Sequence, residues 1–456
     1  MAFLQTTRRF LSGLTLLAVG TAVQAEFADD FATNLYEGRL SEAMTLAETQ
    51  ITEHPEDQRA VFALGVAQFL TGVENLGQGF YRYGLRSNFD TSFQGISGLP
   101  FLRLPVPANP QPEQVTYSGL REVLDGFVND LAKAEETLGT VGPTAFDLPL
   151  DLARIHLDFD GDGASSDREA LLYTFRAVSQ RATSDTGYMA DFDQSDAVWL
   201  QGYCHLISAM AEFLLAHDWE MAFEQTFHGL FPQSDLPSSE LATEIAKVMN
   251  ALSKYGADGM AYPKKPAGMN WNEWRNDPVY LEYQAYSFLE DSLWIASAAD
   301  LVAFIHLFNW PVEEPARMGL ARGHLMEMIA LSRENWRRIK AETDDRREWV
   351  PGPHQSGIFQ RMRVTSETVD AWHLFLDEFE AILEGHRLIK HWRFVDRGVN
   401  VRRIFDEPRT FDPVLIAQGS AVIPYLETGD LVTARTAETM FDLFEGGFLA
   451  YFIWFN

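Results

Sequence analysis

The stretch SGLREVLDGFVNDLAKAEETL, residues 118–138, indicates the fold class because its apolar residues recur at steps of three and four. That spacing predicts a helix with one apolar face. The face comprises Leu120, Val123, Leu124, Phe127, Val128 and Leu131. Strands and helices do not alternate along the chain, which argues against a parallel α/β sheet. The sequence therefore predicts a mostly α protein.

Helical periodicity recurs through the rest of the chain, between loops rich in Trp, Pro and Gly. A short hairpin is expected over 391–405. The apolar run 293–308 is interrupted by Asp300 and His306, so it indicates a buried helix rather than a membrane span. Further helices are predicted near 149–158, 167–182, 196–229, 238–255, 280–309, 313–342, 366–388, 412–425 and 434–446.

The amino-acid composition restricts the classes of protein to which the chain can belong. The chain has 456 residues, enough for two or three domains, and 46% are hydrophobic, which excludes a disordered chain. Lys and Arg total 36 against 65 Asp and Glu, giving a net charge of -29. Such a surface repels phosphate backbones, so nucleic acid is not an expected partner, and the charge suits cations, basic ligands or simple solubility. The single cysteine, Cys204, excludes an intramolecular disulfide and lies in an apolar run typical of a buried thiol.

Residues 1–25 have the pattern of an export signal peptide. Two arginines precede a short apolar run, FLSGLTLLAVGTAV, and small residues at Val23 and Ala25 suit a cleavage site. We therefore expect a mature chain that begins at Glu26, is periplasmic or secreted, and has no transmembrane span after signal removal. The paired arginines leave both the general and the twin-arginine export routes open.

Residues 30–84 carry a 34-residue periodicity. Gly38 and Gly72 are 34 residues apart, and each follows an aromatic-containing stretch and precedes another expected helix. Residues of matching type recur at Ala43, Pro55, Ala60, Leu64, Gly65, Gly77, Tyr81 and Gly84. The segment resembles about two tetratricopeptide repeats, whose period is 34 residues. The resemblance implies helical hairpins over 26–90, which either form a groove for another exported protein or pack onto the rest of the chain.

A proline-rich segment, 91–117, separates these hairpins from the rest of the chain. Its prolines and few helix formers predict an extended connection. The apolar run LPFLRLPVP within it is expected to lie against the body of the protein. Residues 118–456 are then predicted to form a larger, irregular helical domain.

The stretch DFDGDGASSDRE, residues 158–169, carries a motif with a specific chemistry. Acidic residues occupy its first, third, fifth and twelfth positions, and Gly163 at the sixth permits a sharp turn. The stretch resembles the EF-hand calcium loop at every defined position, and the resemblance implies Ca²⁺ as a cofactor. The implied ligands are Asp158, Asp160, Asp162, the carbonyl of Ala164, Ser166 and Glu169.

The neighbouring sequence adds to this expectation. LPLDLARIHL predicts an incoming helix over 149–158, and SDREALLYTFRAVSQ predicts an outgoing helix over 167–182. Ser165 stands where paired EF-hands carry an aliphatic residue, and DFDQSD at 191–196 fits an acidic helix N-cap better than a second loop. A single, unpaired loop favours a structural ion over a cooperative sensor.

Two polar helix faces are weaker metal candidates. Each aligns His with carboxylates at helical spacing, as transition-metal sites in helical bundles do. Together they would suit a metal-oxidase site, and a solvated polar face is the alternative. The residues are His217, Glu220, Glu224 and His228 on one helix, and Asp370, His373, Asp377 and Glu384 on another.

Aromatic residues crowd the loop 269–286, MNWNEWRNDPVYLEYQAY. Aromatic platforms beside paired acids suit glycan cleavage, and ordinary packing is the alternative. The apolar stretch at 448–456, FLAYFIWFN, is expected to pack into the core or a partner surface. The sequence thus predicts an exported, helical, calcium-binding protein rather than an enzyme, with a glycan-cleaving enzyme of the cell envelope as the alternative.

Overall fold

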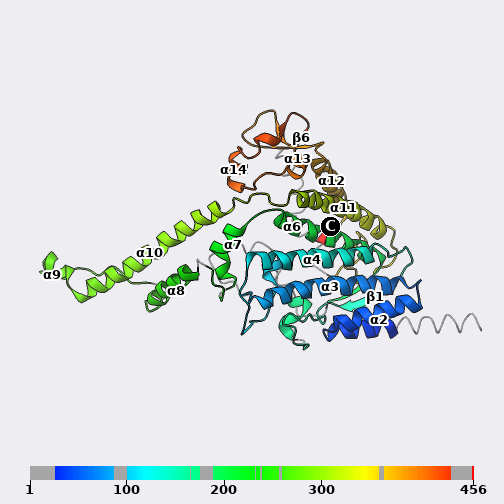
Figure 1. Ribbon diagram of the computed structural model, residues 1–456, viewed down its shortest axis with the longest axis horizontal. Helices are drawn as coiled ribbons and strands as arrows, with labels where there is room; N and C mark the ends of the chain where they lie inside the picture. Colours follow the sequence, from blue (N-terminus) through cyan, green and yellow to red (C-terminus); the bar gives the residue numbers. More distant parts are fainter. Residues whose placement is uncertain are drawn as a thin grey trace, which may run out of the picture.

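The computed structural model describes residues 26–86, 100–164, 166–174, 188–231, 233–236, 239–255, 259–358, 364–432 and 454–455. The predicted mostly helical class is confirmed, because long helices build the body and the strands are short (Figure 1). The predicted signal peptide at 1–25 and the predicted helix at 434–446 lie outside the described residues.

The described elements have the following bounds. The helices are 26–36, α2 (Leu40–Glu53), α3 (Gln58–Arg82), α4 (Tyr117–Leu138), α6 (Gln194–Leu215), α7 (Glu220–Thr226), α8 (Ser239–Ser253), α9 (Trp271–Arg275), α10 (Pro278–Leu307), α11 (Pro315–Ile339), α12 (Ser366–Leu383), α13 (Val401–Asp406) and α14 (Pro413–Gln418). The 3-10 turns are η2 (Pro100–Arg103), η3 (Asp167–Glu169), η4 (Phe227–Gly229) and η5 (Ile423–Tyr425). The strands are β1 (Leu148–Asp151), β2 (Met189–Phe192), β3 (Leu388–Lys390), β4 (Gly398–Val399), β5 (Leu426–Glu427) and β6 (Leu431–Val432).

The body is a layer in which α2, α3, α4, α6 and α11 follow one another in space (Figure 1). The α3 and α4 helices run antiparallel at close range because glycines on α3 face α4. A Cβ on Gly65 would stand 2.6 Å from Leu138 side-chain carbons. A Cβ on Gly79 would stand 2.7 Å from the Val123 side chain. These glycines therefore allow an approach that any larger residue would block.

The α3 helix corrects the repeat prediction at Gly72. The repeat requires a turn after that residue, but α3 continues without a break to Arg82. Gly72 instead faces α4, where a Cβ would lie 3.1 Å from the Cβ of Asp130. Gly38 does make the predicted turn after the helix 26–36, with φ of +70°.

By length and composition, α3 alone among the described helices is apolar enough to cross a membrane. Buried core helices meet the same criteria. Because α3 packs between α2 and α4, its apolar residues are accounted for by the core of the body.

The helix predicted over 196–229 is two helices, because the chain is interrupted between α6 and α7. The carbonyl of Ala216 accepts a hydrogen bond from the Glu313 amide at 2.9 Å. The Asp218 amide donates to the carbonyl of Pro311 at 2.8 Å. A segment distant in sequence thus satisfies the backbone groups at the end of α6, and local periodicity does not reveal it.

Strand β1 replaces the start of the helix predicted over 149–158. It pairs antiparallel with β2, and Leu150 lies opposite Ala190. Leu148 and Leu150 are buried whereas Pro149 is exposed, which is the alternation of a half-buried strand. This pattern covers only four residues, too few to stand out beside apolar residues at helical spacing.

A second core joins α11, α12 and residues 454–455. Trp336, Trp372 and Phe455 are all fully buried, and the Phe455 ring centroid lies 4.7 Å and 5.8 Å from the two tryptophans. For its two described core residues, the prediction that 448–456 packs into the core is confirmed.

A small sheet with strand order β5-β4-β3-β6 lies beyond this second core. The hairpin predicted over 391–405 is displaced: its first strand, β3, ends at Lys390, its second strand is β4, and residues 401–405 belong to α13. The helix predicted over 412–425 is shorter than expected, because α14 ends at Gly419, whose φ is +104°. Buried Cys204 is confirmed on α6, and burial raises the pKa of its thiol.

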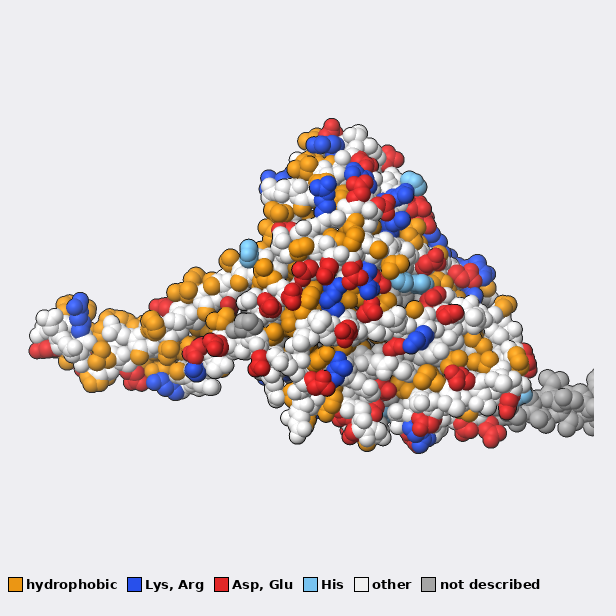
Figure 2. Space-filling model, viewed as in Figure 1, with side chains coloured by type: hydrophobic (Ala, Val, Ile, Leu, Met, Phe, Trp, Pro, Cys, Tyr) orange, Lys and Arg blue, Asp and Glu red, His pale blue; other side chains and the backbone are white. Residues whose placement is uncertain are grey.

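The α8, α9 and α10 helices form an arm that projects from the body (Figure 1). The prediction that 293–308 is buried is wrong, since Trp294 is 73% exposed and Val302 is 67% exposed. Apolar side chains are spread along the arm in Figure 2. Apolar residues are distributed around α10 rather than gathered on one face, a pattern that is typical of buried helices.

Candidate metal centre

The predicted calcium loop is held by a two-stranded stem instead of an incoming helix. His156 and Ala170 form an antiparallel bridge. Beside it, the Leu157 amide donates to the Glu169 carbonyl at 2.9 Å. The predicted helix over 149–158 is therefore wrong on this side of the loop as well, since an extended segment brings the first aspartate into place.

The outgoing side is helical over its first described turns. η3 covers the end of the loop, and residues 171–174 form a single helical turn. Residues 175–187, with the remainder of the helix predicted over 167–182, lie outside the described residues, as does Ser165.

Asp158, Asp160 and Asp162 direct carboxylate oxygens toward one another. One oxygen from each lies within 4.8 Å of the others. The loop turns at Gly161 and Gly163, with φ of +70° and +76°, a conformation that favours glycine. The Asp158 carboxylate accepts the amides of these glycines at 2.7 Å and 2.9 Å. The backbone thus gathers the three aspartates as the motif predicts.

Glu169 closes the loop from its twelfth position and is only 1% exposed. Its Oε1 accepts the Phe159 amide at 3.0 Å. Its Oε2 accepts the Ser166 amide at 3.0 Å and the Ser166 hydroxyl at 2.6 Å. Glu169 and Ser166 are therefore bonded to each other, and Glu169 does not belong to the group of carboxylates that converges at Asp158, Asp160 and Asp162. Ala164 lies on the same loop and donates its amide to Asp162 at 2.7 Å.

Glu74 on α3 is a further acidic residue at the loop, which sequence reasoning missed. Its Oε2 accepts the Asp158 amide at 2.7 Å, and Gln78 donates to the Asp158 carbonyl at 2.8 Å. Burial raises the pKa of Glu74 to about 7, and the charges of Asp158 and Glu169 add to the rise. Glu74 is 84 positions from Asp158, so no local spacing indicates this contact.

Electrostatic repulsion within the loop favours a bound cation. Burial raises the pKa of Asp160, and the charges of Glu169, Asp162 and Asp158 raise it further. A divalent cation among these groups would convert repulsion into attraction. Because the candidate donors are oxygens, the set suits a hard cation such as Ca²⁺.

Phe159 anchors the loop to the body. Its side chain is fully buried, and it lies against Gly77 on α3, where a Cβ would overlap the ring. Gly77 matched a small-residue position of the repeat, and in the structure it makes room for the Phe159 ring of the loop 158–169.

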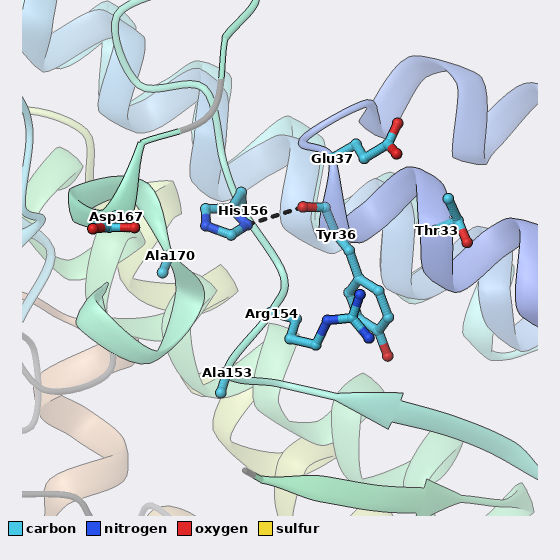
Figure 3. A pocket seen from close by; sticks show the side chains of 8 residues that line it. All are labelled: Thr33, Tyr36, Glu37, Ala153, Arg154, His156, Asp167 and Ala170. Atoms are coloured by element: carbon cyan, nitrogen blue, oxygen red, sulfur yellow. Dashed lines mark hydrogen bonds between the residues drawn. The ribbon is translucent and has the colours of Figure 1, made fainter. Parts of the chain in front are cut away.

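An open polar pocket of about 330 Å³ adjoins the stem of the loop (Figure 3). Figure 3 shows the His156 ring directed at the Tyr36 carbonyl, and Nδ1 lies 3.0 Å from that oxygen. The Arg154 guanidinium lies 4.2 Å from the centroid of the Tyr36 ring. Asp167 and Ala170 of the loop's outgoing side also line this pocket. These contacts brace the stem against the helix 26–36.

The polar face predicted at 217–228 is wrong because its residues do not share a helix. His217 lies in the interruption after α6, and its Nδ1 bonds with the Phe213 carbonyl at 2.7 Å. Glu220 and Glu224 lie on the separate helix α7, and His228 lies in η4.

The polar face on α12 contributes one ion pair with a neighbouring helix. Asp377 lies 2.9 Å from Arg333 on α11. Glu384 lies beyond the end of α12, 3.1 Å from His386. Within the described part of the chain, neither polar face belongs to a group of converging metal ligands.

The acids near the tryptophan-rich loop serve as helix caps. Glu273 accepts the Asn270 amide at 3.1 Å, and Asp277 accepts the Val279 amide at 2.9 Å. Trp271 is exposed, whereas Trp274 is buried. The carboxylates are thus committed to starting α9 and α10.

The stretch 191–196 is confirmed as an acidic N-cap. Asp193 accepts the Ser195 amide at 2.7 Å at the start of α6. Burial raises the pKa of Asp196 well above its usual range and the pKa of Glu348 to about 7, and neighbouring acids add to both shifts. Asp193, Asp196 and Glu348 thus form a second acidic cluster. Among the described residues, they are not a group of converging metal ligands.

The chain has no significant similarity to known proteins, so the proposed function depends on the site alone. The chain matches no family model, and no curated protein or solved structure is significantly similar to it.

Proposed function

We propose that the protein binds one calcium ion in the loop 158–169. The observation that carries the proposal is the convergence of oxygens from Asp158, Asp160 and Asp162 within 4.8 Å of one another. Calcium takes six to eight oxygen ligands in flexible geometry. In the bound form, the Ala164 carbonyl, Ser166 and Glu169 complete the set that the motif implies.

We propose further that the ion is structural. The loop joins an antiparallel stem to α3 through Glu74, Gln78 and the buried ring of Phe159. An ion that neutralises the aspartates therefore strengthens the attachment of the stem to the helical body. We also propose that the protein is exported by a signal peptide at 1–25. The helices over 30–84 would then bind another exported protein. A structural ion is compatible with both roles.

Calorimetric titration of residues 26–456 with CaCl₂ tests calcium binding. We expect one-to-one binding, with a dissociation constant of roughly 10⁻⁴ to 10⁻³ M if the site follows extracellular modules. Asp158→Ala and Glu169→Gln should each abolish the binding heat. Asp167→Asn is the matched control, because Asp167 is an acid of the same loop outside the ligand set and should bind like the wild type.

Absence of calcium binding by the wild type would contradict the proposal, and so would equal loss of binding in Asp167→Asn and Asp158→Ala. The second result would show that general acidity of the loop, rather than the positions of its ligands, attracts the ion.

A further inference from the structure

A large apolar cavity lies between α4, α6, α7 and α11. Its volume is about 490 Å³, within the usual range for small-molecule sites. The inner wall is formed by buried side chains, among them Phe80, Leu124, Trp219 and Phe227. A space of this size amid a packed core is a candidate binding site.

The cavity wall offers a ligand almost no polar partner. Among the described lining residues, the polar groups are the Thr226 hydroxyl and the indole N–H groups of Trp219 and Trp310. Each of them already donates to a backbone carbonyl, at 2.6 Å, 3.1 Å and 2.9 Å respectively. A polar ligand would lose its hydrogen bonds to water without replacement, so the buried part of any ligand should be hydrocarbon.

The outer wall of the cavity is partly exposed and adjoins the end of α10, the longest helix of the arm. Met210 is 38% exposed, and Leu307 and Phe308 at the end of α10 are partly buried. Leu301 and Ile305, which precede them on α10, are 62% and 46% exposed. An apolar path therefore continues from the cavity onto the arm, whose apolar side chains are visible in Figure 2. An elongated ligand with one end outside the cavity suits this arrangement.

We propose that the cavity binds the hydrocarbon chain of a single-chain lipid, either a free fatty acid or a lysophospholipid. Both carry a flexible alkyl chain whose burial is favourable and roughly proportional to apolar area. Both also carry one polar end, which the apolar wall would leave at the mouth. No residue of the loop 158–169 lines this cavity, so the lipid proposal does not rest on the calcium proposal.

Titration of residues 26–456 with a fluorescent long-chain fatty acid tests the proposal. We expect saturable one-to-one binding by the wild type. Ala222→Leu and Ala321→Leu fill the cavity from two helices and should each weaken binding at least tenfold, because both alanines line it. Ala316→Leu makes the same change at an exposed position of α11 and should bind the probe like the wild type.

Circular dichroism and thermal melts establish that each variant folds. Should the filling variants unfold, a chain-length series on the wild type replaces them: affinity should rise with chain length and then level off once the cavity is full. Displacement of the probe by unlabelled fatty acid or by lysophospholipid identifies the source of the chain, and displacement by either supports the proposal.

Three results would overturn the lipid site: no saturable binding by the wild type, equal binding by folded filling variants and the Ala316→Leu control, or an affinity that rises with chain length without levelling. The last two indicate adsorption to the exposed arm rather than occupation of the cavity.

Discussion

At the scale of single residues, Glu348 is an acid whose ionisation opposes folding. Its side chain is 6% exposed, and burial together with Glu342, Asp193 and Asp344 raises its pKa to about 7. The folded chain therefore holds a proton that the unfolded chain releases at a lower pH. The contribution of the protonated Glu348 carboxyl to stability is fully present below the pKa that this group has in the unfolded chain. It is lost as pH rises through about 7, the pKa of Glu348 in the folded chain.

We predict that Glu348→Gln flattens the dependence of stability on pH. Between pH 5 and pH 8 the wild type should lose on the order of 1 kcal/mol more of its unfolding free energy than the variant. Urea denaturation at the two pH values measures this difference. Glu48→Gln on the exposed face of α2 should follow the wild type, and identical slopes for wild type and Glu348→Gln would show that this carboxylate is not the source.

Gly77 gives a second prediction at this scale. In Gly77→Ala the new Cβ overlaps the Phe159 ring, so the variant should lose about 1 to 3 kcal/mol of unfolding free energy. Gly126→Ala on α4 is the control, since nothing lies within 4 Å of its Cβ position, and it should gain about 0.5 to 1 kcal/mol. Because Phe159 belongs to the loop, Gly77→Ala should also weaken calcium binding; a variant as stable as the wild type would contradict this packing.

At the scale of elements, Arg317 joins three helices of the body. From α11 it contacts Asp125 on α4 at 2.6 Å, and Glu212 on α6 at 3.0 Å. Glu212 has a nearly buried side chain, 4% exposed, so removal of the arginine leaves its charge without its main partner.

We predict that Arg317→Met lowers the unfolding free energy by about 2 to 3 kcal/mol. The double variant Arg317→Met/Glu212→Gln should recover part of the loss, because the buried charge is then gone. Denaturant titration of the wild type, both single variants and the double variant gives the coupling energy. A strictly additive double variant would show that the two side chains do not stabilise each other.

The helices and loops also show which features of the structure could be predicted from the sequence alone. The face of α4 was predictable because it depends on residues three and four apart, and Leu120, Leu124 and Phe127 are buried as expected. The convergence of the aspartates in the loop 158–169 was predictable for the same reason, because it depends on residues close together in sequence. The end of α6 and the role of Glu74 were not, because their partners are distant in sequence.

At the scale of the whole molecule, the arm and the body should differ in their tolerance of substitution. Phe288 and Trp294 on α10 are 71% and 73% exposed. Replacing both with Ser should change the unfolding free energy of the body by less than about 0.5 kcal/mol. Trp372→Ala in the second core removes a fully buried ring and should cost about 3 to 5 kcal/mol. Similar losses from both changes would mean that the arm contributes to the core.

At this scale, the proposed calcium ion should hold the loop 158–169, its stem and α3 together. An ion that binds the folded chain alone shifts the folding equilibrium in proportion to the occupancy of its site. The charge of the chain, -29, increases the benefit of each neutralised carboxylate.

The most direct measurement is the thermal melt of residues 26–456 in saturating calcium and in chelator, with Glu169→Gln beside the wild type. We predict that calcium at about 100 times its dissociation constant raises the melting temperature of the wild type by roughly 3 °C and leaves the variant unchanged. Superimposable wild-type melts in calcium and chelator would contradict the claim that a calcium ion in the loop 158–169 stabilises this fold.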